Sequence, residues 1–299
     1  MTESATSTEI AAQQPHTKHV GEFARICSAV LHNPGAVLGL ILVVILVFTA
    51  IFAPFIAPYK PTRMGAGPRL IPPTLNHPFG TDEFGRDLFS RVVHGARLTL
   101  RIGVVAVTIS LISGLLVGLI GGYAGKWTER ILMRSMDVLF SFTETLIALA
   151  AVAVLGPSLT NATIAVGIAA IPFYARVTYG VVLVEKNKTY FDGGIAAGAN
   201  HVRMIFIHLL PNVIPQLIVV ATLGVSTAVL AAAGLSFLGL GAQPPLPEWG
   251  FMLSSGRDLF ARAPWIMIFP GLAIVITVLG FNLLGDGLRE ALDPRQRKA

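Results

Sequence analysis

The chain has 299 residues, of which 54% are hydrophobic and 13% are charged, and its mean hydropathy is +0.71. Soluble domains carry about 25% charged residues, so this composition excludes an ordinary soluble domain and indicates an integral membrane protein. The net charge is +6, but the basic residues are scattered between apolar stretches. That pattern is typical of loops at a membrane surface and argues against a nucleic-acid partner.

The chain begins with a polar segment, residues 1–34, which we expect to be a cytoplasmic tail. It lacks the short apolar region and the small-residue cleavage site of a secretory signal. The apolar stretch that follows is therefore expected to remain as the first transmembrane helix, residues 35–57. Cys27 is the only cysteine, which excludes an internal disulfide and a metal site built from cysteines.

Stretches of about 20 mainly apolar residues are long enough to cross a membrane, and the chain contains six of them. They cover residues 36–56, 101–122, 138–156, 161–184, 216–239 and 264–284. Six spans place both termini on the same side of the membrane. If that side is the cytoplasm, the inner segments carry somewhat more Lys and Arg than the outer ones, so the positive-inside rule weakly favours this orientation.

The first outer loop, residues 58–98, ends in a stretch with an amphipathic pattern. From Asp87 onward, apolar residues fall on one helical face and polar residues on the other, which predicts a helix lying in the membrane interface. Two interpretations stay open, a membrane-surface elbow and a contact surface for an external partner. The candidate contact residues are Asp82, Arg86, Asp87, Arg91 and, from the second outer loop, Trp249.

Two patterns inside the spans carry further expectations. Gly114, Gly118 and Gly122 form a smooth stripe on the second span, which allows another helix to approach closely. Glu144 and Arg176 are charged residues within the third and fourth spans. Charges inside a membrane usually pair, so we expect an ion pair between them, with separate exposure to a water-lined pathway as the alternative.

A charged, glycine-rich stretch separates the fourth and fifth spans, "YFDGGIAAGANHVRMIFIHLLPN", residues 190–212. Asp192 is expected to cap a short helix, and Gly198 to form a turn. Asn200 is then expected to cap an amphipathic second helix that ends or kinks near Pro211. The small residues between these positions would let another protein come close at the cytoplasmic surface.

These residues resemble a known family. Asp192-Gly193-Gly194, then Gly198, then Leu210-Pro211 resembles the EAA loop of ABC importer permeases. "FGTDEFGRDLFSRVVHGARLTL", "LSFLGLGAQPPLPEWGFML" and "FNLLGDGLREALDP" resemble the dipeptide/oligopeptide/nickel branch, and the similarity runs from about residue 35 to 295. The loop departs from the family at its start, where Asp replaces Glu and two glycines replace two alanines, which makes that helix more flexible.

The resemblance implies an all-α integral membrane protein with a type I ABC importer permease core at residues 99–288, a peripheral first helix and a cytoplasmic tail at 289–299. It implies a second homologous permease, two ABC ATPases and an extracytoplasmic solute-binding protein as partners in a prokaryotic inner membrane. Residues 188–211 would couple the permease to the ATPases. The coupling residues would be Asp192, Gly193, Gly194, Ala197, Gly198, Ala199, Arg203 and Pro211. The cargo would be di- or oligopeptides, with glutathione or a nickel chelate as alternatives.

The chain lacks the G-x-x-x-x-G-K-S/T pattern of nucleotide-binding loops. We therefore expect no cofactor in this chain, with ATP and Mg²⁺ bound by the partner ATPases, and no enzymatic activity. A secondary transporter would need ion or proton relay groups within the membrane, for which only Glu144 and Arg176 qualify. A channel is not excluded by the spans alone, and uptake indifferent to ATP would favour either rival.

Overall fold

The computed structural model describes residues 30–292, so the tail with Cys27 and the last seven residues lie outside the described part. Its elements are α2 (Pro34–Ile56), α3 (Leu88–Tyr123), α4 (Lys126–Phe140), α5 (Glu144–Leu155), α6 (Leu159–Ala169), α7 (Ile171–Lys186), α8 (Thr189–Ala196), α9 (His201–Arg203), the π-helical turn η1 (Met204–Leu209), α10 (Leu210–Phe237), α11 (Trp249–Gly256), the 3-10 turn η2 (Arg257–Leu259) and α12 (Trp265–Leu292). Between residues 30 and 292 the only β-type pairing is one isolated bridge, from Thr81 to Asp87. This confirms the all-α fold.

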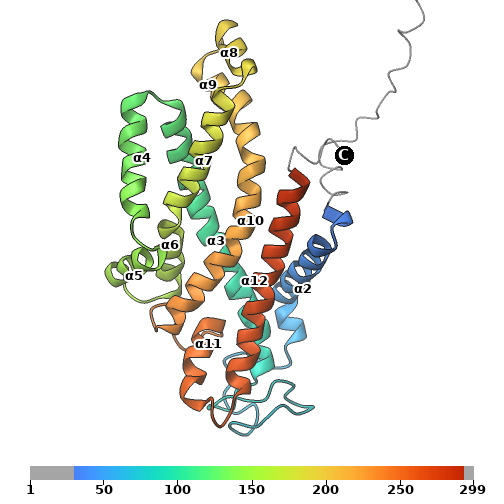
Figure 1. Ribbon diagram of the computed structural model, residues 1–299. Helices are drawn as coiled ribbons and strands as arrows, with labels where there is room; N and C mark the ends of the chain where they lie inside the picture. The colour runs from blue at the N-terminus through green and yellow to red at the C-terminus, as the bar shows by residue number, and fades with distance from the viewer. Residues whose placement is uncertain (1–29, 293–299) are drawn as a thin grey trace, which may run out of the picture.

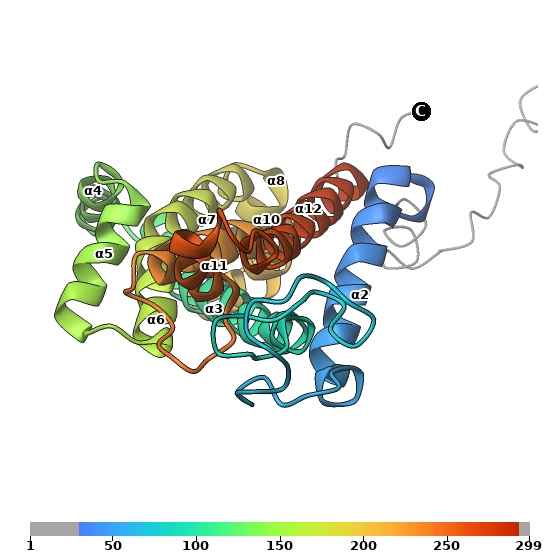
Figure 2. The same ribbon diagram turned by 90° about the horizontal axis from the view of Figure 1, so that it is seen from below.

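The long helices run side by side, and α4, α5 and α6 lie along one side of the bundle (Figure 1). α8 and α9 project at one end, whereas α11 and the loop that precedes α3 lie at the other. α2 sits at the edge, packed against α12 and α3, as the view along the bundle shows (Figure 2). The first helix is therefore peripheral, as expected.

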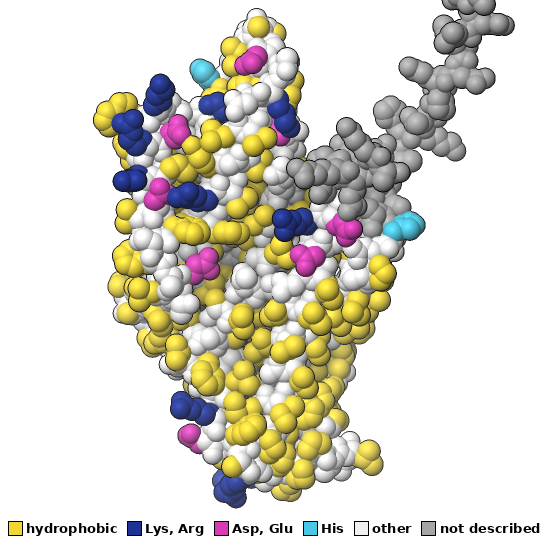
Figure 3. Space-filling model, in the orientation of Figure 1, with side chains coloured by type: hydrophobic (Ala, Val, Ile, Leu, Met, Phe, Trp, Pro, Cys, Tyr) yellow, Lys and Arg dark blue, Asp and Glu magenta, His cyan; other side chains and the backbone are white. Residues whose placement is uncertain are grey.

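Five helical stretches of the described chain are long and apolar enough to cross a membrane. They are Pro34–Ile56, Leu88–Tyr123, Leu159–Lys186, His201–Phe237 and Trp265–Leu292. Each contains one of the spans expected from the sequence, apart from ends that differ by a few residues. On the face shown in Figure 3, charged side chains gather toward the two ends and hydrophobic ones cover the zone between them, which matches a membrane-spanning bundle.

The expected third span, residues 138–156, is not a straight helix. α4 and α5 form a bent pair, with an angle of 91° across the break at residues 141–143. α4 packs against α7, and α5 then turns crosswise to the long helices at the edge of the bundle, where it packs against α6 (Figures 1 and 2). Thr143 starts α5 by accepting a hydrogen bond from the Leu146 N–H at 3.3 Å. The bend was not predicted, because the length and composition of an apolar stretch carry no information on the direction of the helix axis.

The predicted interfacial helix at the end of the first outer loop is wrong as a separate element. α3 is one continuous helix of 36 residues that starts at Leu88 and continues through the second span. Its N-cap is Asp87, whose carboxylate accepts from the Ser90 N–H at 2.8 Å. Ser90 and Arg91, on the expected polar face, are 0% and 2% exposed because the outer loops fold over them.

The glycine stripe of α3 packs directly against α7. A Cβ atom added at Gly118 would lie 2.5 Å from the Ala175 carbonyl oxygen, and one at Gly114 would lie 2.4 Å from the Tyr174 Cβ. Real Cβ atoms do not approach other atoms so closely. The close packing of α3 against α7 therefore requires glycine at these positions. This confirms the close helix approach expected from the sequence.

Candidate functional site

The segment between α7 and α10 extends beyond the ends of the long helices (Figure 1). Gly198, at the turn after α8, has a φ of +77°, a left-handed conformation that glycine adopts without steric cost. Asn200 caps α9, and its side-chain oxygen accepts from the Arg203 N–H at 2.8 Å. The structure thus confirms the helix–turn–helix arrangement expected within residues 188–211.

One local expectation for this segment is wrong, because Asp192 lies inside α8, whose N-cap is Lys188, so the Asp192 carboxylate does not cap the helix. Of the two outcomes expected for the second helix near Pro211, an end or a kink, the end is wrong, because the chain stays helical from α9 through η1 into α10. Pro211 has no N–H to donate, and the π-helical turn directly before it changes the hydrogen-bond pattern at that point.

An apolar cluster fixes the projecting segment to the bundle. Phe191 of α8 and Met204 of η1 are 4% and 1% exposed. They pack with buried residues of α3, α7, η1 and α10, namely Leu119, Val181, Val182, Leu209, Val213 and Leu217. Burying each large apolar side chain contributes roughly 1.5–3 kcal/mol, so the base of the projection is held as part of the core.

Hydrogen bonds reinforce the same anchor. The Tyr123 hydroxyl at the end of α3 lies 2.7 Å from His201 Nδ1. The Glu185 carboxylate accepts from Lys188 Nζ at 2.5 Å and from the Tyr190 hydroxyl at 2.7 Å. Burial and the hydrogen bond to Glu185 raise the pKa of Tyr190 to about 12, so Tyr190 keeps its proton and remains a donor at neutral pH.

The outer side of the projection is open in this chain. The residues expected to couple to a partner are exposed or half-buried: Asp192, Gly193, Ala197, Gly198, Arg203 and Pro211 are exposed, and Gly194 and Ala199 are half-buried. Ile195 and Val202 lie among them, 56% and 63% exposed. Exposed apolar and small side chains on a rigidly held projection make a surface suited to docking another protein.

The expected ion pair between Glu144 and Arg176 is wrong. Arg176 pairs instead with Asp137 of α4, which runs beside α7. Asp137 directly precedes the expected third span, and its place in α4 beside α7 was not predicted from the sequence. Glu144, at the start of α5 after the bend, forms no hydrogen bond or ion pair within residues 30–292. It lines two adjoining cavities of about 300 and 180 Å³.

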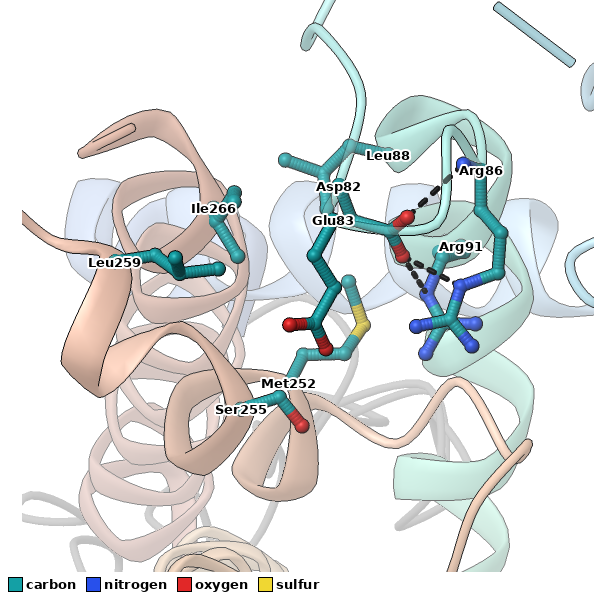
Figure 4. Close-up of a pocket in the computed structure, with 9 residues that line it drawn as sticks. All are labelled: Asp82, Glu83, Arg86, Leu88, Arg91, Met252, Ser255, Leu259 and Ile266. Atoms are coloured by element: carbon teal, nitrogen blue, oxygen red, sulfur yellow. Dashed lines mark hydrogen bonds and ion pairs between the residues drawn. The ribbon is translucent and has the colours of Figure 1, made fainter. Parts of the chain in front are cut away.

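At the opposite end of the molecule, a buried ion cluster ties the outer loops together (Figure 4). The Asp82 carboxylate accepts from Arg86 Nε at 2.5 Å and lies 3.8 Å from Arg91 Nε. Arg91 also donates to the Pro61 and Pro245 carbonyl oxygens, at 3.0 and 3.4 Å. Arg91 therefore holds together three segments, the loop before α3, α3 itself and the loop before α11, and the Asp82 carboxylate pairs with it.

The external contact surface expected at this cluster is wrong for the side chains named. Asp82, Arg86, Asp87, Arg91 and Trp249 are all between 2% and 6% exposed. The Trp249 indole donates to the Val92 carbonyl oxygen at 2.9 Å and so packs inside the chain. The cavity beside the cluster has about 10 Å³, room for roughly one water molecule, so it is not a ligand site. These buried residues hold the outer loops in place and do not themselves form the outer surface.

Two polar residues with roles in this architecture, Tyr174 and Glu185, were not predicted from the sequence. Tyr174, 2% exposed, lines the 180 Å³ cavity beside Glu144. Glu185 anchors the projection. The signal for Glu185 was its place within "VEKNKTY", where a lone acid stands among lysines at the end of a span. Tyr174 left no such signal, because a tyrosine in an apolar run is usually core.

Comparisons with known proteins agree with this architecture. Residues 114–298 match the family model described as binding-protein-dependent transport system inner membrane component. Residues 25–73 match the N-terminal TM domain of oligopeptide transport permease C. The fold is similar to that of the MetNI methionine ABC transporter in an inward-facing conformation, with a TM-score of 0.58 at 21% sequence identity, covering 68% of this chain and 97% of that one.

Curated relatives are similar over most of their length. The chain is 46% identical to the dipeptide transport system permease protein DppC of Alkalihalophilus pseudofirmus, over 89% of this chain and 87% of the relative. It is 45% identical to the di/tripeptide transport system permease protein DppC of Pseudomonas aeruginosa, over 96% and 97%. It is 46% identical to the glutathione transport system permease protein GsiD of Pectobacterium atrosepticum, over 75% and 74%. The chain therefore belongs to the family of inner membrane components of binding-protein-dependent transport systems.

Proposed function

We propose that this chain is one of two permease subunits of an ABC importer for dipeptides and similarly short peptides. A second, homologous permease completes the translocation pathway. Two ATPase subunits bind ATP and Mg²⁺ beneath the membrane, and an extracytoplasmic solute-binding protein delivers the cargo. This chain holds no cofactor of its own and catalyses no reaction.

The observation that carries the proposal is the projection formed by α8, the Gly198 turn and α9. Its outer side is exposed and its base is buried through Phe191 and Met204. A motor that docks on the outer side can therefore push or pull α3, α7 and α10 together, because the buried base packs against all three. Rigid-body motion of this kind lets a permease open alternately to the two sides of the membrane.

The cargo follows from the relatives. The names of those described above specify dipeptides, di- and tripeptides and glutathione, which is itself a small peptide. This favours a short peptide over the nickel chelate that the resemblance left open. The adjoining cavities beside Glu144 offer polar groups along an otherwise apolar path, which suits a small polar cargo.

The projection and the charges support an orientation in the membrane. Asn33, before α2, donates a hydrogen bond to Glu290 near the end of α12. The start of α2 and the end of α12 therefore lie next to each other. They lie toward the end from which α8 projects (Figure 1). With ATPases in the cytoplasm, the projection and both termini face the cytoplasm of a prokaryotic inner membrane, in the sense that the positive-inside rule weakly favours.

Reconstitution tests the proposal. The chain is co-expressed with the second permease and the ATPases, and the purified complex is placed in liposomes with the binding protein and labelled dialanine. ATP should drive accumulation of the dipeptide, and a non-hydrolysable ATP analogue should not. Accumulation at the same rate without ATP would show a secondary transporter or a channel. Failure of the ATPases to co-purify with the permease pair would contradict the coupling role.

A further inference from the structure

Three half-open cavities adjoin on one face of this chain, where Glu144, Phe173 and Thr227 in their linings are exposed. The first two, of about 300 and 180 Å³, share Glu144 and Phe173 in their linings. The second shares Phe173, Gly224 and Thr227 with a third cavity of about 610 Å³. Each shared residue marks a point of contact between neighbouring cavities. The third cavity by itself lies in the size range of small-molecule sites, roughly 300–1,000 Å³.

Glu144 is the one charged residue that lines the first two cavities. Its carboxylate has no hydrogen bond or ion pair in the described chain, and the nearby cation Arg176 is taken by Asp137. A carboxylate within a membrane is costly unless it meets a partner, and such residues mark pathways for ions and substrates. Glu144 is exposed to both cavities in this chain, so a group that carries positive charge or donates hydrogen bonds can reach its carboxylate there.

A second polar group in the same cavity lacks a partner. Tyr174 is 2% exposed, and its hydroxyl forms no hydrogen bond. The hydroxyl lies against Gly224, where an added Cβ would come within 1.9 Å of it. Gly224 lines the cavity too, so its missing side chain is what leaves room for the hydroxyl. A buried hydroxyl without a partner costs about 1–3 kcal/mol, which a cargo that hydrogen-bonds to it would recover.

We propose that Glu144 and Tyr174 form a binding site for a positively charged group of the cargo, foremost the primary ammonium of a peptide. The ammonium would donate to the Glu144 carboxylate and to the Tyr174 hydroxyl oxygen. The third cavity is lined by Arg289 of the last turn of α12, so the adjoining cavities bear a negative group and a positive group, complementary to a zwitterion. This inference rests on the proposed function, because it assigns a site to the cargo of that importer.

The test uses the complete complex in liposomes, with this chain as wild type or variant. The solute-binding protein is a separate chain, so its affinity for each dipeptide is the same in every experiment. Glu144→Gln should lower the dialanine uptake rate at least about tenfold, the factor that corresponds to 1.4 kcal/mol. Glu144→Asp should restore most of it, since the charge returns. Tyr174→Phe should lower uptake by a smaller factor.

Cargo charge separates a binding role from a structural one. Glu144→Gln should lower the uptake of Lys-Ala relative to Glu-Ala by about tenfold against wild type, because the carboxylate that attracts one side chain and repels the other is gone. A merely structural role would lower both equally. Asp258→Asn removes one acidic charge at the exposed outer surface and should leave the ratio unchanged.

Two results would overturn the site. One is wild-type dialanine uptake and an unchanged Lys-Ala to Glu-Ala ratio in Glu144→Gln. The other is loss of complex assembly in both Glu144→Gln and Glu144→Asp, which would make Glu144 a contact to the second permease. If the wild-type complex transports no dipeptide with ATP, the proposed function is wrong. This failure is distinguishable from failure of the site, because it needs only the wild-type complex.

Discussion

At the scale of single residues, side chains with short-range roles were predictable from sequence. The Gly198 turn and the Asn200 cap follow from local conformational preference, and both are present. Asp192 shows the limit of the same reasoning, because the position of a cap depends on which extended residue directly precedes the helix, and here that residue is Lys188. Arg176 shows it again, since its partner Asp137 lies on a different helix.

Gly198→Ala and Gly193→Ala are the same chemical change in opposite settings. At a φ of +77°, a Cβ costs roughly 1–2 kcal/mol, so Gly198→Ala should distort the turn of the projection. Gly193 is helical with nothing within 4 Å of an added Cβ, so Ala there should stabilise α8 by up to about 1 kcal/mol. We expect Gly198→Ala to lower the peptide transported per ATP hydrolysed and Gly193→Ala to keep it. Equal coupling in both variants would refute the role of this turn.

Glu248 gives a pH-dependent prediction. It caps α11, with its carboxylate accepting from the Gly250 and Phe251 N–H groups at 2.9 and 2.8 Å, and is 1% exposed. Burial outweighs these bonds and raises the pKa of Glu248. Because the folded chain then binds the proton more tightly than the unfolded chain, the stability from Glu248 is complete below the ordinary glutamate pKa of about 4.3 and decreases as the pH rises through the raised pKa.

The variant Glu248→Gln isolates this effect, because it keeps the side-chain volume and cannot titrate. The Tm of wild type minus that of Glu248→Gln, measured in detergent, should decrease as the pH rises from about 4 to about 7. Other titrating groups cancel in the difference. A difference that increases over this range would mean that the cap bonds, and not burial, dominate the pKa of Glu248.

At the scale of elements, the close approach of α3 and α7 depends on positions without side chains. Gly118→Ala would place a Cβ 2.5 Å from the Ala175 carbonyl oxygen and 2.6 Å from the Thr178 Cβ, and backbone atoms cannot yield cheaply. We expect a loss of about 1–3 kcal/mol in stability as the helices separate. Thermal unfolding in detergent, followed by tryptophan fluorescence, measures it.

The matched control lies on α7. Gly180→Ala adds the same methyl group where nothing lies within 4 Å, so it should be neutral or stabilise the helix by up to about 1 kcal/mol. If the two variants had the same Tm, the glycine stripe would not determine how closely α3 and α7 pack.

At the scale of the whole molecule, the two ends of the bundle differ in what they present. One end carries a projection with an exposed docking surface, and the other is closed by outer loops tied through Asp82 and Arg91. This difference fits a subunit that receives cargo on one side and a motor on the other.

Labelling tests which end faces the cytoplasm. In a Cys27→Ser background, Leu75→Cys lies in the outer loop, where Leu75 is fully exposed, and Lys126→Cys lies at the start of α4 on the other side. A membrane-impermeant maleimide should label Leu75→Cys in intact spheroplasts and Lys126→Cys only after permeabilisation. The reverse pattern would place the projection outside and contradict the proposed orientation.

By itself, the sequence determined the fold class, the position of each apolar span, the glycine stripe and the helix–turn–helix segment. These features depend on composition, periodicity and local conformational preference, all of which are local in the chain. Tertiary structure alone decided the 91° bend after α4, the burial of Arg91 and the pairing of Arg176 with Asp137. Each of these depends on which distant segment lies alongside. For the same reason, only the folded chain places Glu144 and Tyr174 in one cavity, without partners of their own.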